Sequence, residues 1–583
     1  MISAPPAHMT RDLELEALQH AARWPHTAPS TILVLAGRFL ARGRDQDAYV
    51  YFRERAEAEP AQPLFRALEG QFQVRLASQL SSFERSAWLD EALGKLDRAV
   101  DLAPGLPTYI RGVVLTELPA NLGMAEAARA DLEWVIANPE RVPHSFRRGA
   151  YRALARAYAE LGRLDDSKAA LARSGYPSLD SELPTFVTDS WLTLQDGFHF
   201  AQPRLVELAP RVYVAQGFDF GDFAFVRTDD SIVAIDAGTT PAHARAALDA
   251  LRKISDLPIR HVIVTHAHWD HVGGLSAFLE PDTQVIAHAA FAEELRIVNE
   301  TGVPFRTFFG PDGKQAFELR PDRLVREAET LVLGGTEFSL YPVHGGETSD
   351  ALLVHLPASG VLFTGDVLMP FLGAPFLPEG SAEGLFETLE LIQRLAPRLL
   401  VHGHTPLTEQ FTVEILPALD AALRELHQQV LEGVRNAQTL VQILGRNVLP
   451  NVLQANPAAV MPYLLLRENF VKRVYHQRSG YWKPDGEGIE VFAPDEWAAA
   501  LTLLAGGRQH AFVESARTLL GRHEDALALR LVELGLHSFP DSQDLLERRQ
   551  QALQRLRALH QQLNPFKFIV YSEWAQSELT PVE

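Results

Sequence analysis

The stretch "THAHWDHVGG", Thr265 to Gly274, places three histidines and one aspartate within six positions. It follows the apolar run "HVIV", which is typical of a buried strand. In extended backbone, residues two apart point the same way, so His266 and His268 are expected to face one point. Asp270 and His271, one bend further along, are expected to face a second point nearby. A solvated histidine-rich loop is the alternative, but the position directly after a buried run disfavours it.

The composition limits which metal ligands are available. The chain has no cysteine, so any metal ion must be held by imidazole or carboxylate groups. Such ligands suit Zn²⁺, and also Fe or Mn. Further candidates follow other apolar runs: His344 in "YPVHGGETSD", Asp366 in "VLFTGDVL" and His404 in "LLVHGHTPL". His402 is an alternative to His404, because it lies only two residues earlier.

These motifs together resemble the metallo-β-lactamase superfamily over about residues 194–409. The resemblance implies an αββα sandwich with two metal ions at one edge. It implies one ion on His266, His268 and His344, the other on Asp270, His271 and His404, with Asp366 bridging both. It favours His404 over His402, because the family places its last ligand after the glycine. Asp236 in "IVAIDAG" matches the family's first motif, where an aspartate orients the metal loop without binding metal.

The implied chemistry is metal-assisted hydrolysis. Two divalent ions about 3.5–4 Å apart lower the pKa of a shared water, which gives a hydroxide near neutral pH. The hydroxide attacks an electrophilic carbonyl, phosphorus or sulfur centre, and the ions stabilise the developing charge. Asp270 and Asp366 are the catalytic candidates, the first because it can also orient or deprotonate the nucleophile. Zn²⁺ is the expected metal at both positions.

A second resemblance concerns the alkylsulfatase-type members of the superfamily. "QGFDFGDFAFV" is similar to their entry motif, and about residues 425–545 are similar to their dimerisation domain. This implies a homodimer through the C-terminal helices. Two features depart from the pattern: such sulfatases carry glutamates where this chain has His344 and Asp366, and "GDVLMPFLGAPFLPEG" lacks the arginine of their sulfate-binding segment.

The same apolar segment bears on the substrate. An apolar stretch beside the metals favours an acyl, aromatic or otherwise apolar ester-like substrate, with plain core or lid packing as the alternative. Phe371 and Phe376 in this segment are candidate pocket residues. Trp269, between two ligands, is a third candidate that either lines the pocket mouth or packs under the loop.

The elements that must position these groups form three predicted regions. Residues 1–185 are read as helical hairpins similar to tetratricopeptide repeats, with a plain helical bundle as the alternative. Residues 190–412 are read as the catalytic α/β domain, and residues 413–583 as the helical dimerisation-like domain. The catalytic domain is expected to hold a hairpin at 227–231, a helix at 242–254 and strands near 284–287, 330–333, 337–342, 351–355, 361–364 and 399–401. The terminal "FKFIVYSEW" is read as a β-like piece.

The bulk properties exclude some functions. The 583 residues carry a formal net charge of −20, which repels phosphate backbones and disfavours nucleic-acid binding or nuclease activity. The sequence shows neither a secretion signal nor an apolar run of the ~20 residues that span a bilayer. We therefore expect a cytoplasmic protein that acts on a small molecule, with a further protein partner possible for the N-terminal repeats.

The leading hypothesis is a dinuclear zinc hydrolase of an ester-like bond: a carboxylic ester, thioester or lactone, or alternatively an alkyl sulfate. A second hypothesis is a repeat-protein scaffold with a vestigial metal domain, which the full ligand set disfavours. A third is a di-iron redox enzyme, which the lack of a recognisable flavin-binding domain disfavours.

Overall fold

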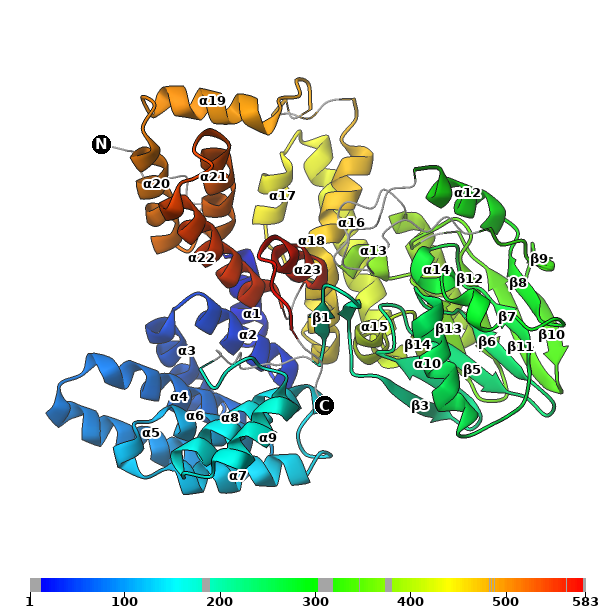
Figure 1. Ribbon diagram of the computed structural model, residues 1–583. Coiled ribbons are helices and arrows are strands. Elements are labelled where there is room, and N and C mark those ends of the chain that lie inside the picture. Colours follow the sequence, from blue (N-terminus) through cyan, green and yellow to red (C-terminus); the bar gives the residue numbers. More distant parts are fainter. Residues whose placement is uncertain are drawn as a thin grey trace. The chain divides into compact units, whose positions relative to one another are not determined.

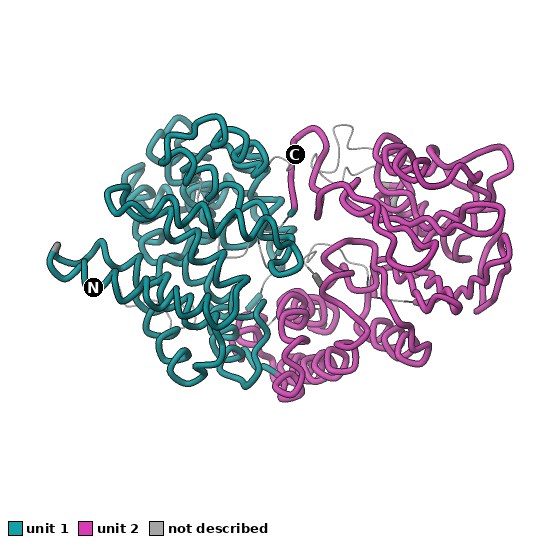
Figure 2. Tube along the Cα trace, turned by 90° about the horizontal axis from the view of Figure 1, so that it is seen from below, with its two compact units in different colours: residues 1–189, 447–449, 482–583 teal, residues 190–446, 450–481 magenta. Residues whose placement is uncertain are grey.

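The structure, a computed structural model, describes residues 12–180, 189–301, 318–344, 346–372, 380–481, 483, 485–486, 488–561 and 564–579. Contacts divide the chain into two compact units (Figure 2). The helical unit comprises residues 1–189, 447–449 and 482–583, and the sheet unit comprises residues 190–446 and 450–481. The first and last helices of the chain therefore belong together. Much of the region from 413 to 481 belongs with the sheets, so these units cut across the predicted 413–583 domain.

The sheet unit contains a seven-stranded and a five-stranded sheet. The strands of the first, in spatial order, are β3 (Arg204–Ala209), β4 (Val212–Gln216), β5 (Phe223–Arg227), β6 (Ile232–Ile235), β7 (Ile259–Ile263), β8 (Gln284–His288) and β9 (Arg323–Val325). Those of the second are β10 (Glu329–Leu333), β11 (Thr336–Pro342), β12 (Leu352–Leu356), β13 (Val361–Gly365) and β14 (Leu399–His402). A separate hairpin pairs β1 (Trp191–Thr193) with β2 (Gly197–His199). The predicted hairpin and strands of the catalytic region are present, with ends shifted by a residue or two.

Both faces of the seven-stranded sheet are buried at β4, β5 and β6, which explains why these strands read as nearly continuous apolar runs. Along β4, Val212 and Val214 belong to the core shared with the other sheet, whereas Tyr213 and Ala215 belong to the opposite core. The shared core joins side chains of both sheets, including Phe363 of β13. This period of two fixes which face each strand residue takes.

Helices cover the sheets and connect their parallel strands (Figure 1). The outer core of the seven-stranded sheet includes side chains of α10 (Pro241–Arg252) and α12 (Phe291–Thr301). In the other sheet, α14 (Ala382–Leu395) is the crossover between the parallel strands β13 and β14. The predicted α/β sandwich with flanking helices is confirmed.

The sheet unit also holds α11 (Trp269–Val272), α13 (Met369–Leu372), α15 (Thr405–Gln410), α16 (Leu416–Arg435), α17 (Leu440–Gly445) and α18 (Val460–Arg478). Helix α16 packs against α18 and α14, and α13 packs against α18. The C-terminal helices 416–478 therefore support the segment that follows β13, which carries one of the predicted metal ligands.

The helical unit is built from antiparallel neighbours. Its first nine helices are α1 (Leu13–Ala21), α2 (Pro29–Ala41), α3 (Asp45–Ala58), α4 (Pro63–Leu76), α5 (Ser82–Leu102), α6 (Leu106–Glu117), α7 (Ala125–Ala137), α8 (Arg147–Glu160) and α9 (Leu164–Ser174). The C-terminal helices of this unit are α19 (Pro494–Leu504), α20 (Gln509–Gly521), α21 (Asp525–Ser538), α22 (Gln543–His560) and α23 (Pro565–Trp574). Small residues let consecutive helices approach: a Cβ on Gly70 of α4 would lie 2.9 Å from Leu96 Cγ of α5. The similarity of these helices to tetratricopeptide repeats stays a prediction.

The terminal piece read as β-like is in fact the helix α23, so that prediction was wrong. Pro565 occupies the first turn, where its missing N–H costs nothing, and the Asn564 side chain accepts a hydrogen bond from Lys567 N at 3.0 Å. The helix packs against α22 and buries Phe568 and Ile569. A short apolar run does not distinguish strand from helix, and here the cap and the neighbouring helix decide.

An ion-pair network explains why the two ends of the chain share one unit. Asp12 accepts hydrogen bonds from Arg38 of α2 and from Arg42, the residue directly after α2. Arg42 also donates to the backbone oxygen of His523 at 2.7 Å and lies 3.4 Å from Asp525 of α21. Burial raises the pKa of Asp12, but the charges of Arg38 and Arg42 and the hydrogen bonds outweigh burial, and the pKa lies well below its usual value.

Within the described ranges, we find no helix that combines the length and apolarity needed to cross a bilayer.

Candidate active site

Seven buried side chains form two groups in which the possible metal-ligating atoms lie within 4.8 Å of one another. One group is Asp270, His271, Asp366 and His404, and the other is His266, His268 and Glu347. The imidazole rings of His266 and His271 have centroids 4.2 Å apart, so the groups adjoin. Six of the seven predicted metal ligands therefore come together. The seventh member, Glu347, was not predicted.

The loop after β7 carries four of these side chains. His268 lies in extended backbone directly before the one-turn helix α11, His266 lies two residues earlier, and Asp270 and His271 lie within α11. The two glycines that follow bring the loop close to its neighbour: a Cβ on Gly273 would lie 1.9 Å from Thr239 O. The glycines at the end of "THAHWDHVGG" are therefore required by a backbone contact rather than by chain flexibility.

Asp236 contacts this loop through both oxygens of its carboxylate. It follows β6 with φ +58°. One carboxylate oxygen accepts a hydrogen bond from Thr265 N at 2.7 Å, and the other accepts from Thr265 Oγ1 at 2.7 Å and from His271 Nδ1 at 2.9 Å. With its proton on Nδ1, His271 presents Nε2 to Asp270 at 3.5 Å and to Asp366 at 3.4 Å.

Asp366 and His404 follow the parallel strands β13 and β14, whose carboxyl ends meet at one edge. His404 Nε2 lies 2.8 Å from Asp366 Oδ2, and its Nδ1 donates to Phe220 O at 2.8 Å. His402 serves elsewhere: its Nδ1 accepts from Thr364 Oγ1 at 2.7 Å, and its Nε2 donates to Phe411 O at 3.0 Å. Both ring nitrogens of His402 are used, so the structure brings His404 rather than His402 to the site.

The three-residue group contains Glu347 and does not contain the predicted ligand His344. His344 is exposed, and its Nδ1 lies 3.3 Å from the carbonyl oxygen of Ser349. Glu347 instead enters the site, with Oε2 3.1 Å from His266 Nε2 and Oε1 3.5 Å from His268 Nδ1. A signal for this was present in the sequence, because alkylsulfatase-type members carry a glutamate at this ligand position.

Burial and mutual charge strongly perturb the pKa values in the site. Burial raises the pKa of Glu347 well above its usual range. Burial also acts to raise the pKa of Asp366, but the charges and hydrogen bonds of His404 and His271 outweigh it and hold that pKa well below its usual range. For His404, burial is outweighed by the charge of Asp366 and its hydrogen bond, and the pKa rises to about 9.

The donor set fits metal binding. Among the described residues, four buried atoms of the site have no hydrogen-bond partner: His266 Nε2, His271 Nε2, Glu347 Oε2 and Asp366 Oδ1. Buried polar atoms are costly when unsatisfied, and these face one another rather than solvent. Four imidazoles and three carboxylates without sulfur suit two Zn²⁺, Fe or Mn ions.

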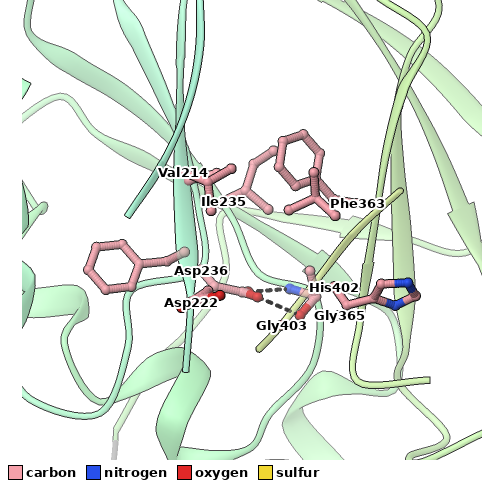
Figure 3. A pocket seen from close by; sticks show the side chains of 12 residues that line it. Val214, Asp222, Ile235, Asp236, Phe363, Gly365, His402 and Gly403 are labelled. Carbon is pink, nitrogen blue, oxygen red and sulfur yellow. Dashed lines mark hydrogen bonds between the residues drawn. The ribbon is translucent and has the colours of Figure 1, made fainter. Parts of the chain in front are cut away.

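A small cavity lies between the two sheets directly behind the site (Figure 3). Asp236 and His402 line it, together with Asp222 and apolar side chains such as Val214 and Phe363. Burial raises the pKa of Asp222 to about 7 against the lowering effect of a hydrogen bond from Thr405. The groups that support the ligands are therefore packed in a protein interior that holds them in fixed geometry.

The predicted pocket residues have different surroundings. Trp269 is half-buried and stacks on Phe220, with ring centroids 5.7 Å apart. Phe220 and Phe200 each meet the ring of His404 edge-on, at 4.8 and 5.3 Å. An aromatic wall formed by Trp269, Phe220 and Phe200 thus adjoins the second group.

Phe371 is buried against α18, with its ring centroid 5.3 Å from that of Phe470 and 5.5 Å from Arg473 Cζ. The structure therefore shows Phe371 packed between α13 and α18, in keeping with the alternative of core packing. The other predicted pocket residue of this segment, Phe376, lies outside the described residues.

Comparisons with known proteins agree with this geometry. The profile of the Metallo-beta-lactamase superfamily matches residues 217–404. A hydroxyacylglutathione hydrolase from Methylococcus capsulatus is 30% identical over 220 residues, which are 37% of this chain and 75% of that protein. The chain belongs to the metallo-β-lactamase superfamily. The residues matched by the profile contain all seven side chains of the site.

The likeness to alkylsulfatases extends further along the chain. A linear primary-alkylsulfatase from Pseudomonas sp. is 20% identical over 323 residues, 48% of this chain and 60% of that protein. The structure of a stereoselective inverting sec-alkylsulfatase from Pseudomonas sp. matches with a TM-score of 0.52 and 19% identity, covering 64% of this chain and 65% of that chain. The predicted alkylsulfatase-like fold is confirmed, although the match spans less than two thirds of either relative.

Proposed function

We propose that this protein is a hydrolase that holds two divalent metal ions, most consistent with Zn²⁺, on the seven side chains of the site. The observation that carries the proposal is the pair of adjoining ligand groups with buried, unsatisfied atoms. When bound, such ions supply a Lewis-acidic centre that activates water and stabilises developing negative charge.

The chain's own residues have distinct roles in this proposal. His266, His268 and Glu347 hold one ion, and Asp270, His271 and His404 hold the other. Asp366 is proposed to join the two groups, since its carboxylate contacts both imidazoles of the second group and its charge acts on the pKa of His266 and Glu347 of the first group. Asp270 has an oxygen 3.5 Å from each of those imidazoles and is proposed to orient the attacking water or take its proton.

We propose an alkyl sulfate ester as the first substrate class. Glu347 is what supports it, because one of the two departures from the alkylsulfatase ligand pattern disappears once Glu347 replaces His344. The half-buried ring of Trp269, backed by the buried rings of Phe220 and Phe200, is an apolar contact beside the second ligand group, which suits an alkyl chain.

A thioester or carboxylic ester is the second candidate. Asp366 stands where alkylsulfatase-type members have a glutamate, and the relative at 30% identity is named a hydroxyacylglutathione hydrolase. Both classes require the same metal-assisted attack and differ in the bond that is broken.

The test is sulfate release from dodecyl sulfate by metal-loaded protein, run beside a thioester, an aryl ester and a lactone, with Asp366→Ala as control. Sulfate release that is absent in the control supports the alkyl sulfate. Cleavage of the thioester, aryl ester or lactone without sulfate release refutes the alkyl sulfate and supports the ester class. Metal-loaded protein that cleaves none of them refutes the proposed hydrolase and revives the scaffold hypothesis.

We also propose that the protein forms a homodimer through its C-terminal helices. Helix α19 exposes large apolar side chains: Trp497 is 50%, Leu503 83% and Leu504 84% exposed. Such a face is typical of an interaction surface. Light scattering after size-exclusion chromatography should give twice the 64.7 kDa chain mass, and Leu503→Asp with Leu504→Asp should shift it to the single chain. A monomeric native protein contradicts the proposal.

A further inference from the structure

The loop between β4 and β5, residues 217–222 ("GFDFGD"), lies against the second ligand group although none of its residues is a ligand. Its two ends are joined, because Gly217 N donates to Asp222 Oδ1 at 3.3 Å. Its path depends on glycine: Gly217 has φ +71°, and a Cβ there would lie 2.4 Å from Ala201 O. The loop is therefore a fixed element of the site rather than a free connection.

Asp222 binds the turn that carries His404 on both sides of that histidine. Its backbone N–H donates to Gly403 O at 2.6 Å, and its Oδ2 accepts from Thr405 Oγ1 at 2.7 Å. Between these two bonds, His404 Nδ1 donates to Phe220 O at 2.8 Å. Three bonds thus fasten the His404 turn to one short loop. The last of them places the imidazole proton on Nδ1 and leaves Nε2 for the site.

The same loop also touches the segment that carries Asp270. A Cβ on Gly221 would lie 2.4 Å from Asp270 O, and the ring of Phe220 stacks on Trp269. The loop is therefore wedged between the backbones that bear Asp270 and His404, whose ligating atoms Oδ2 and Nε2 lie 3.5 Å apart.

We propose that Asp222 is a positioning residue for the second metal ion: through Gly403, Thr405 and loop 217–222 it fixes His404 relative to Asp270. This inference rests on the proposed two-metal hydrolase. Asp222 contacts neither water nor substrate in this role. It acts by holding the distance between two ligands that come from different strands.

The test uses full-length protein and measures binding of Zn²⁺ and the absorption spectrum of the Co²⁺-substituted protein. Supporting contacts of this kind are typically worth about 10–100-fold in metal affinity. Asp222→Ala should weaken one of the two ions by that factor, leave the other within about twofold, and change the cobalt bands of one equivalent only. Asp222→Asn keeps one acceptor oxygen for Thr405 and should recover part of the loss.

Two further variants separate positioning from general destabilisation. Thr405→Val removes the hydroxyl that Asp222 accepts from and should reproduce a smaller part of the same loss. The losses of the two single variants should not add in the double variant, because both break one contact. Asp525→Ala removes an equally buried aspartate in the helical unit and should lower the unfolding temperature while leaving both ions and the cobalt spectrum unchanged.

The outcomes distinguish the two levels of the proposal. Native protein that binds no Zn²⁺ or Co²⁺ refutes the proposed function. Native protein that binds two ions, beside a folded Asp222→Ala variant with both affinities and the cobalt spectrum unchanged, refutes the positioning role alone. If Asp222→Ala does not fold, Thr405→Val decides the question by the same measurements.

Discussion

Glu347 and His344 lie three residues apart, and only one of them is expected to bind the first metal ion. Glu347 supplies the only negative charge in its group and is 4% exposed. The ligating atoms lie within 4.8 Å of one another, so a bound ion lies closer than that to the carboxylate. A pair of unit charges 4 Å apart attract by about 4 kcal/mol at an effective dielectric constant of about 20. Ionising a carboxyl whose pKa is raised by burial offsets part of this gain.

We therefore expect Glu347→Gln, which keeps the shape and removes the charge, to cost about 3 kcal/mol of metal binding, or about 100-fold in Kd. His344→Ala removes an exposed side chain and should change the affinity by no more than about twofold, because surface substitutions are worth about 0.5 kcal/mol or less. Metal content after dialysis against a chelator of known affinity, and calorimetric titration of the metal-free protein, both measure this difference.

The reverse result would refute the reasoning. If His344→Ala lost one equivalent of metal while Glu347→Gln kept both at native affinity, His344 and not Glu347 would be the ligand. Circular dichroism of both variants controls for folding, and Zn²⁺ binding by the second group serves as the internal reference.

Three further predictions concern catalysis, pH and substrate. Asp366→Ala should reduce turnover at least about 1000-fold with unchanged circular dichroism, since the group contacts both His271 and His404; near-native turnover with full metal content would contradict the shared site. Asp12→Asn should destabilise the protein by about 2 kcal/mol in urea unfolding at pH 7, because the buried Arg38 loses the charge of Asp12 while it keeps its ion pair with Glu14. The folded pKa of Asp12 is depressed, so its contribution is present above pH ~4 and lost below it; an equal difference between native and variant at pH 7 and pH 3 would contradict this. Trp269→Ala should raise KM several-fold for a dodecyl substrate and little for a short one, whereas equal effects on both would remove Trp269 from the apolar wall.

Much of the site could be predicted from the sequence because its geometry is local. His266, His268, Asp270 and His271 lie within six positions after one strand, and strand periodicity with a single helical turn sets their directions. The strands themselves follow from apolar runs that the sandwich buries on both faces. The order of motifs was therefore enough to predict the fold class and six of the seven side chains in the two groups.

Tertiary contacts decided the rest. The turn after β11 has Gly346 at φ +86°, where a Cβ would lie 2.3 Å from Val367 O, so packing against the segment after β13 selects which side chain of "HGGETSD" enters the site. The packing of Phe371 on Phe470 could not be predicted, because the two residues lie 99 positions apart and no local pattern indicates their contact. Likewise, Arg42 joins the first helices to the last ones through Asp12 and Asp525.

The sequence by itself thus determined the kind of chemistry. The types of the ligand residues and their local spacing are the same however distant segments of the chain pack. Only the tertiary structure placed Glu347 rather than His344 among the seven buried side chains, and Asp222 beside the turn that carries His404. Both depend on where backbone from a distant part of the chain lies within a few ångströms of the site, and local periodicity carries no information about such distances.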